Sequence, residues 1–319
     1  MFADAFEKWA DKDKDEADLA AVKQKLDDAR AKLAAAAEGL SMPPDREMLL
    51  AAIKEKVQAV RSYIPKVGIF GDSGVGKSSL CNALFGREIA KISDVAACTR
   101  EPQEILIGEQ ENGGGIVLVD VPGIGEDLER HAEYSALYQS LAPKLDLVLW
   151  AVKADDRNYR SALDVYPKVF RAGVETPVVF VITQIDKTNP IRDWDIANCC
   201  PGEAQKRNIV EKEAEVSAKF DISMRNIISI SAEEGYNLRE LVDRVVEVLP
   251  NEKKYSFARE AKEQVVSDLT RQNAERGVWD TVKEFVGDAW ESVKEVATDM
   301  IVTSASKFVG RILTSFKFW

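Results

Sequence analysis

Residues 71–78, Gly71-Asp-Ser-Gly-Val-Gly-Lys-Ser78, follow the spacing GxxxxGK[ST] and lie between an apolar run at 67–70 and a helical pattern that starts near Lys77. Glycines at these positions let successive backbone N–H groups face an anion, and the helix that follows adds its positive end. We expect Lys77 to reach the β- and γ-phosphates of a nucleotide and the hydroxyl of Ser78 to ligate Mg²⁺. The stretch therefore predicts a phosphate-binding loop, to which we assign Gly71, Asp72, Ser73, Gly74, Val75, Gly76, Lys77, Ser78 and Ser79.

Short apolar runs alternate with helical patterns around this loop, from residue 64 to about 250. The runs lie at 66–70, 104–108, 116–120, 145–152, 177–183 and 226–231. Such alternation is typical of a mainly parallel β-sheet covered by helices on both faces. The second and third runs are joined by Glu111-Asn-Gly-Gly-Gly115, which favours a hairpin and hence one antiparallel edge strand. The predicted fold class is therefore α/β.

Three further motifs follow later runs. Asp120-Val-Pro-Gly123 ends the third, where a carboxylate can hold Mg²⁺ through water and the N–H of Gly123 can sense a γ-phosphate. Thr183-Gln-Ile-Asp-Lys187 ends the fifth, and a carboxylate there suits guanine, whose N1–H and N2 amino group are paired donors. Ser231 and Ala232 end the sixth and fit a loop that contacts the base. Because α/β sheets bind ligands at the carboxyl ends of their strands, these motifs together predict one guanine-nucleotide site.

In this order the four motifs resemble the G1, G3, G4 and G5 motifs of translation-factor-class P-loop GTPases, specifically the Era-like, 50S-ribosome-binding type. The chain is similar above all to the YfjP/YeeP-like bacterial subgroup, in which helical ends flank the GTPase core. The resemblance implies a P-loop GTPase domain over residues 64–250, GTP and GDP with Mg²⁺ as ligands, and hydrolysis of GTP. It also implies that Cys98-Thr99-Arg100 contains the switch I threonine, so that Mg²⁺ has Ser78, Thr99 and Asp120 as ligands.

The same resemblance assigns roles to the remaining residues. The catalytic set would be Lys77, Thr99, Asp120 and Gly123. The base site would consist of Thr183, Gln184, Asp186, Lys187, Ser231 and Ala232. Loss of the γ-phosphate would release switch I, near residues 88–101, and switch II, near residues 122–134.

Four positions depart from the family pattern. The motif that resembles G4 reads Thr183-Gln184 where Asn-Lys is common, although Asp186 is kept. Ile124 stands where Ras-like enzymes have a water-orienting glutamine, and an isoleucine cannot polarise water. Gly74 stands where K⁺-stimulated members have asparagine. We therefore expect slow intrinsic hydrolysis without strong acceleration by K⁺, until a partner, self-association or another group completes the site; the nearby acids are Glu126, Asp127 and Glu129.

The composition argues against several other classes of protein. Acidic residues outnumber basic ones by 54 to 43, and the net charge of −11 disfavours broad binding of nucleic acid. Four cysteines without CxxC spacing and a single histidine, His131, lack the usual ingredients of a zinc site or a disulfide framework. The acidic first residues do not match a signal peptide, and no run of about 20 apolar residues could span a bilayer. We expect a cytoplasmic protein.

Both ends of the chain show helical periodicity. We expect residues 1–63 to form an N-terminal helical segment and residues 251–319 a C-terminal one that packs with it. From Trp279 onward apolar residues recur every three or four positions, and residues 300–319 contain three bases and no acid. The amphipathic segment 279–319 has three readings: packing on the N-terminal helices, which is favoured, binding at a membrane interface, and binding in the groove of a partner protein.

The favoured function is a nucleotide-dependent switch whose helical ends carry the signal outward. The alternative is a dynamin-like or immunity-GTPase-like mechanical protein that forms a nucleotide-dependent dimer and lies peripherally on the inner membrane surface. A ribosome-assembly GTPase is a further alternative, although no GxxG clamp or basic RNA-binding domain follows the core. An ATPase stays open, because a P-loop alone does not choose between adenine and guanine.

Overall fold

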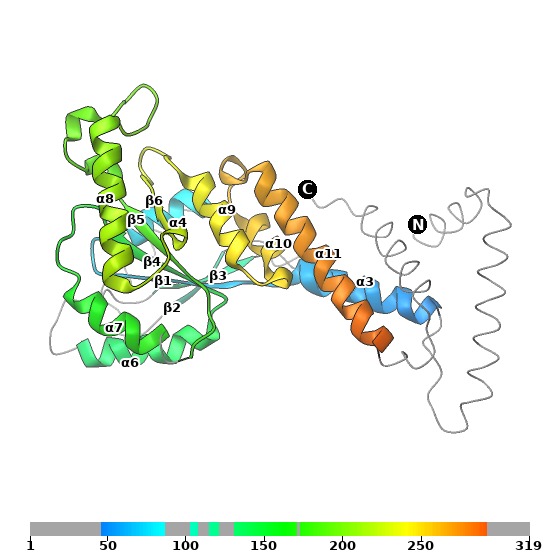
Figure 1. Ribbon diagram of the computed structural model, residues 1–319. Helices are drawn as coiled ribbons and strands as arrows, with labels where there is room; N and C mark the ends of the chain where they lie inside the picture. Colours follow the sequence, from blue (N-terminus) through cyan, green and yellow to red (C-terminus); the bar gives the residue numbers. More distant parts are fainter. Residues whose placement is uncertain (1–45, 87–102, 108–114, 121–130, 171–172, 292–319) are drawn as a thin grey trace, which may run out of the picture. The chain divides into compact units, whose positions relative to one another are not determined.

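The computed structural model describes residues 46–86, 103–107, 115–120, 131–170 and 173–291 (Figure 1). The chain divides into two compact units. The larger unit, residues 55–281, holds the sheet and the helices that cover it, and the smaller unit comprises residues 1–54 and 282–319. The helix expected before residue 46 and the basic tail at 300–319 lie outside the described residues, so both stay predictions.

A six-stranded sheet lies at the centre of the larger unit, in the order β2-β3-β1-β4-β5-β6. β2 pairs antiparallel with β3, and the other four neighbouring pairs are parallel. The predicted α/β class and the antiparallel edge strand are therefore confirmed. The strands are β1 (Lys66–Phe70), β2 (Gln103–Ile107), β3 (Ile116–Asp120), β4 (Leu147–Lys153), β5 (Val178–Thr183) and β6 (Ile227–Ser229).

Helices cover both faces of this sheet (Figure 1). Helices α6, α7 and α8 share one apolar core with the sheet, in which Trp150 is fully buried and stacks on Phe180 with 5.9 Å between ring centroids. Helix α9 contacts β5, α4 and α10 and covers the opposite face. The helices are α3 (Arg46–Ser62), α4 (Lys77–Phe85), α6 (His131–Leu141), α7 (Arg160–Phe170), α8 (Glu203–Phe220), α9 (Leu238–Val248), α10 (Asn251–Glu260) and α11 (Asp268–Glu291). Short 3-10 turns are η2 (Ala142–Lys144), η3 (Ile185–Lys187), η4 (Ile191–Asp193), η5 (Met224–Asn226) and η6 (Glu263–Val265).

Helix α10 is joined to the sheet unit by several contacts. The hydroxyl of Ser256 donates to the carbonyl oxygen of Val60 on α3 at 2.9 Å. The ring of Phe257 is fully buried and meets Phe85, the last residue of α4, edge to face at 5.9 Å. The chain beyond residue 250 therefore stays packed on the sheet unit, which extends to residue 281.

Asp146 ties four elements together at the amino ends of the parallel strands. Its carboxylate is 8% exposed and accepts hydrogen bonds at 2.8 Å from both the hydroxyl of Tyr63 and the backbone N–H of Lys66. It also forms an ion pair at 2.6 Å with Lys253 on α10. Because the phosphate-binding loop leaves the opposite end of β1, this cluster stabilises the edge of the sheet away from the predicted nucleotide site.

On α11 Ala274, Val278 and Val282 are fully buried. Val282 lies on the expected apolar face, three positions after Trp279, which is itself half-buried. On α3, Ile53, Val57 and Val60 recur every three or four positions and are buried. Each helix in the described part of the chain is too short or too polar to cross a membrane.

Candidate nucleotide site

The predicted phosphate-binding loop connects β1 with α4. Gly71 has a φ of +139°, and a Cβ at this position would lie 2.4 Å from the backbone oxygen of Ala151 on β4. Only glycine lets the chain pass this close to the neighbouring strand. Gly76 precedes α4 in the left-handed conformation, and no side chain within the described residues caps this helix. The N–H groups of its first turn therefore suit an anion, which the positive end of the helix attracts.

Lys77 folds back over the loop. Its ammonium group donates hydrogen bonds to the backbone oxygens of Gly71 at 3.1 Å and Asp72 at 2.9 Å. Ser78 and Ser79 follow in the first turn of α4, the former half-buried and the latter exposed. A cation and a hydroxyl thus stand at the start of one helix, which is the pair of groups that phosphates and Mg²⁺ require.

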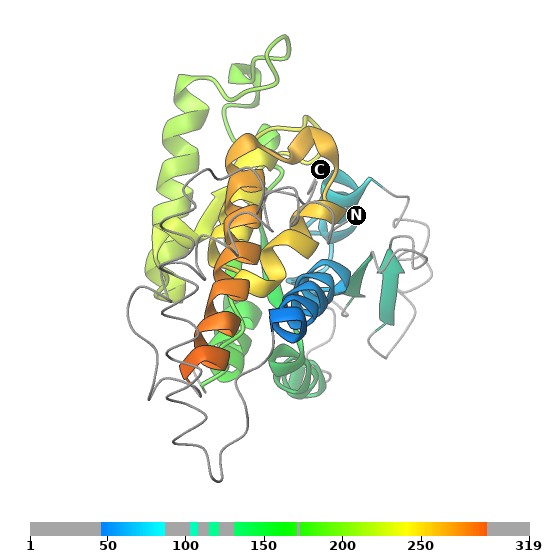
Figure 2. The same cartoon turned by 90° about the vertical axis from the view of Figure 1, so that its right-hand side faces the viewer.

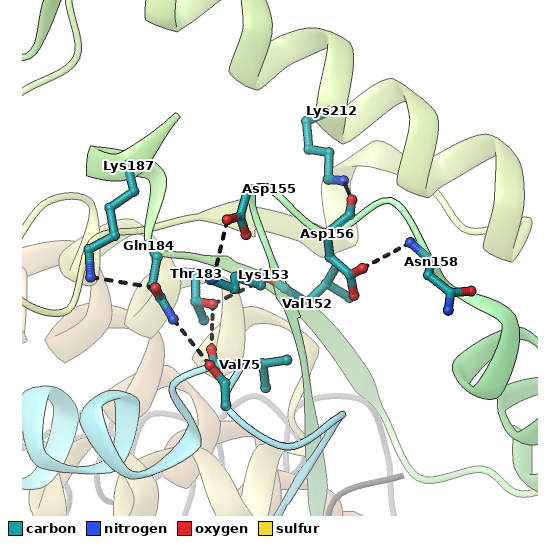
Figure 3. A network of polar contacts seen from close by, with 11 residues as sticks. Val75, Val152, Lys153, Asp155, Asp156, Asn158, Thr183, Gln184, Lys187 and Lys212 are labelled. Carbon is teal, nitrogen blue, oxygen red and sulfur yellow. Dashed lines mark hydrogen bonds and ion pairs between the residues drawn. The ribbon is translucent and has the colours of Figure 1, made fainter. Parts of the chain in front are cut away.

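The end of β5 braces the loop from the side (Figure 3). Thr183 is 2% exposed, and its hydroxyl donates to the backbone oxygen of Val75 at 2.6 Å. The next residue, Gln184, has a φ of 59° and donates its side-chain amide to the backbone oxygen of Gly74 at 3.4 Å. The sequence assigns Thr183 to the base site, and that assignment stays a prediction. In the structure its buried hydroxyl donates its proton to the phosphate-binding loop.

Asp186 and the loop after β6 lie beside this end of β5. Asp186 is half-buried in the turn η3, and the N–H of Ile185 in that turn donates to the backbone oxygen of Ile230 at 3.3 Å. Ser231 is fully buried and accepts a hydrogen bond at 3.2 Å from the N–H of Glu234, while Ala232 is half-buried. The structure therefore brings the described parts of the three predicted loops, after β1, β5 and β6, to one edge of the sheet.

An exposed ion pair bridges the two loops assigned to the base. The ammonium group of Lys187 lies 3.5 Å from a carboxylate oxygen of Glu233. Both side chains are more than half exposed, at 51% and 73%, so this pair contributes little to stability.

Three residues in or near these loops are not signalled by any sequence motif. Gln205 is fully buried on α8 and donates to backbone oxygens of the loop after β5. Asp193 accepts hydrogen bonds from the N–H groups at the start of α8. Trp194 packs its ring edge to face against Tyr236, with 5.9 Å between centroids. The partners lie on different elements, so only the folded chain reveals them.

The other predicted positions lie at the edges of the described residues or outside them. At one edge, Asp120 is the last residue of β3, and its Cα is paired with that of Ile69 on β1. The backbone thus places Asp120, the start of the motif that resembles G3, next to the strand that carries the phosphate-binding loop. His131 begins α6. Outside the described residues lie Thr99, Gly123, Ile124, Glu126, Asp127, Glu129, switch I and residues 122–130 of switch II.

Glu213 on α8 has a shifted acidity. Burial raises the pKa of this carboxyl, although it accepts a hydrogen bond at 2.6 Å from the hydroxyl of Ser229 on β6. Among the described residues no three His, Cys, Asp or Glu side chains gather into a metal site.

Comparison with known proteins identifies the family. Residues 66–184 match the family described as 50S ribosome-binding GTPase. The uncharacterized protein YkfA of Escherichia coli (strain K12) is 39% identical over 215 residues, which are 67% of this chain and 70% of YkfA. The uncharacterized protein YfjP of the same organism is 38% identical over 202 residues, which are 63% of this chain and 67% of YfjP. The GTPase Era of Alkaliphilus oremlandii (strain OhILAs) is 30% identical over 190 residues, which are 59% of this chain and 57% of that protein.

The sheet order and the loop between β1 and α4 define the class of P-loop nucleotide-binding α/β proteins. Within that class the chain belongs to the Era-like GTPases, in the group that contains YkfA and YfjP, and it is a GTP hydrolase.

Proposed function

We propose that this GTPase is a guanine-nucleotide switch that hydrolyses GTP slowly. One observation carries the proposal: the two side chains at the end of β5 hold consecutive backbone oxygens of the phosphate-binding loop, at 2.6 Å from Thr183 and 3.4 Å from Gln184. These hydrogen bonds join the phosphate-binding loop to the turn whose carboxylate would bind the base. Binding of phosphate at the loop would therefore affect the geometry of the base site.

The residues of the loop would divide the work of binding. Lys77 would bind the β- and γ-phosphates, and the backbone from Gly71 to Ser79 would donate to their oxygens. Ser78, Thr99 and Asp120 would hold Mg²⁺, which neutralises charge on the transferred phosphoryl group. Gly123 would read the γ-phosphate through its N–H and so connect the nucleotide state with switch II.

The base would be read by Asp186, whose carboxylate matches the paired donors of guanine. Lys187, Ser231 and Ala232 would line the same pocket, and Thr183 and Gln184 would keep it in register with the phosphates. Ile124 offers no group that orients water, which supports slow turnover by the isolated chain.

Nucleotide affinity of the full chain tests the base assignment. We expect GDP to bind more tightly than ADP, and Asp186→Asn to remove that preference while it leaves ADP binding unchanged. Asp164→Asn on α7 is the matched control, because it makes the same chemical change at an exposed carboxylate on a helix, where Asp164 forms an i,i+4 ion pair with Lys168 at 2.6 Å. Preserved preference for GDP in Asp186→Asn would contradict the assignment. A fast single-turnover rate without K⁺ or partner would contradict slow hydrolysis.

We also propose that the helical ends carry the signal outward from a cytoplasmic protein. The bases and aromatic side chains of residues 300–319 support peripheral attachment to an anionic membrane surface. Co-sedimentation with phosphatidylserine-containing vesicles compares the full chain with a chain that ends at Asp299. We expect only the full chain to pellet, and equal pelleting would remove the tail from the proposal.

A further inference from the structure

Gln205 is a fully buried polar side chain in direct contact with the turn that carries Asp186. Its amide nitrogen donates to the backbone oxygen of Thr188 at 2.8 Å and to that of Asp186 at 3.4 Å. Loss of these acceptors would be unfavourable, because it would leave a buried hydrogen-bond donor without a partner. The contact therefore constrains the path of the backbone at residue 186.

The orientation of this amide follows from the chemistry of its partners. Both partners are carbonyl oxygens, so the nitrogen and not the oxygen of the amide must face them. The oxygen of Gln205 is buried and has no hydrogen-bond partner among the described residues. An amide turned the other way would set its oxygen against two more oxygens. The side chain thus has one stable arrangement, which holds the turn from one side.

The start of α8 is built so that Gln205 reaches the turn. One carboxylate oxygen of Asp193 accepts hydrogen bonds from the N–H of Ala204 at 2.8 Å and from that of Gln205 at 3.0 Å. A Cβ on Gly202 would lie 2.3 Å from the backbone oxygen of Asp193, so glycine is required for this close approach. Asp193 therefore fixes the first turn of α8, on which Gln205 lies.

The segment between η3 and α8 also touches the second base loop. It projects beyond the sheet at the end of α8 in both views (Figure 2). From this segment Trp194 packs on Tyr236, the residue whose backbone pairs with Ser231 at 3.0 and 3.3 Å. The chain after β5 thus returns to both loops that are assigned to the base.

We propose that Gln205 is a positioning residue for guanine recognition, acting through the backbone of Asp186. The inference rests on the proposed role of Asp186 as the residue that reads guanine. Gln205 holds the backbone at residues 186 and 188, and this sets the direction in which the carboxylate of Asp186 meets the base. Guanine donates two hydrogen bonds to that carboxylate, so guanine binding depends on the direction of the carboxylate. Adenine lacks this pair of donors, so adenine binding does not depend on it.

The test is the ratio of ADP to GDP dissociation constants in the full chain. Gln205→Met keeps the length of the side chain and removes the donors, and we expect it to weaken GDP binding about tenfold with ADP binding unchanged. Ser217→Ala is the matched control, because the hydroxyl of Ser217 donates at 2.7 Å to the backbone oxygen of Ile222 at the other end of α8. It should lower thermal stability without a change in the ratio. A parallel loss of ADP and GDP binding in Gln205→Met would overturn the inference.

A double-mutant cycle separates this inference from the proposed function. In the background of Asp186→Ala, Gln205→Met should change GDP affinity less than twofold, because no carboxylate is left to position. If Asp186→Ala itself leaves the ratio unchanged, the guanine assignment fails. The guanine assignment requires Asp186→Ala to bring the ratio of dissociation constants to one. If it does so and Gln205→Met weakens GDP binding equally in both backgrounds, only the inference fails. Should Gln205→Met not fold, Asp193→Ala must lower the same ratio, and an unchanged ratio there would also overturn the inference.

Discussion

Replacement of Thr183 by valine tests the brace between β5 and the phosphate-binding loop. Valine has nearly the shape of threonine but no proton to donate. The change removes the 2.6 Å bond to the backbone oxygen of Val75, a residue that is only 4% exposed. Loss of a hydrogen bond whose acceptor stays buried costs about 1–3 kcal/mol.

The nucleotide-free variant can recover part of this cost if the loop turns the oxygen of Val75 towards water. Binding of phosphate then requires the loop to turn back. If the recovered part is about 1.4 kcal/mol, the binding-competent loop is populated about tenfold less and the Kd for GDP rises about tenfold. The remainder appears as a loss of roughly 1 kcal/mol in the free energy of unfolding.

Thr176→Val supplies a control on the same segment. Thr176 precedes β5, at the end opposite to Thr183, and its hydroxyl donates to the backbone oxygen of Ala142 at 2.7 Å. Urea unfolding should show comparable losses of stability in the two variants. Titration with a fluorescent GDP analogue should show weaker binding only for Thr183→Val. Equal Kd values in both variants would refute the reasoning, because the brace would then have no effect on the loop.

Three further predictions concern stability. Gly71→Ala should cost about 3 kcal/mol or more, since its Cβ would meet a backbone oxygen at 2.4 Å, whereas Gly74→Ala has open space and should cost only about 1 kcal/mol of left-handed strain; equal losses in thermal unfolding would speak against this. Asp146→Ala should lower the free energy of unfolding by about 3–5 kcal/mol, because Lys253 and the hydroxyl of Tyr63 would lose their partner, and GDP affinity should not change. Glu213→Gln should raise Tm at neutral pH. Because the pKa of Glu213 is raised in the folded state, the wild-type protein loses stability as the pH rises through that pKa. The gain in Tm of the variant should therefore vanish below the ordinary glutamate pKa of about 4.3. A gain in Tm that does not vary with pH would contradict the assignment.

The strands and the phosphate-binding loop could be predicted because their signals are local. Residues 147–152 of β4 are all buried, as an unbroken apolar run predicts for a strand covered on both faces. Glycine spacing likewise marks the loop without knowledge of the rest of the chain. Such features depend on residues that are neighbours in the sequence, so the sequence alone is enough to recognise them.

Contacts between elements could not be predicted in the same way. Gln205 stands in a helix rich in charged residues, and its partner Asp186 is 19 positions away. On α11 the choice between Val278 and Trp279 depends on what packs against the helix, because apolar residues stand at both positions. The sequence places Thr183 at the end of a strand. Its hydrogen-bond acceptor, the backbone oxygen of Val75, is known only from the fold, which brings the phosphate-binding loop next to β5.

The attachment of α10 determines how this chain can be cut or fused. A fragment that stops at residue 250 would expose the ring of Phe85 and leave the backbone oxygens of Val60 and Leu84 without their donors on α10 and Lys262. Residues 55–281 form a compact unit that keeps these groups covered, and both of its boundaries fall inside helices, α3 and α11. A domain grafted at either boundary would continue a helix, so each residue inserted at the junction would turn the graft by about 100°. Linker length at these junctions is therefore a choice of angle as much as of distance.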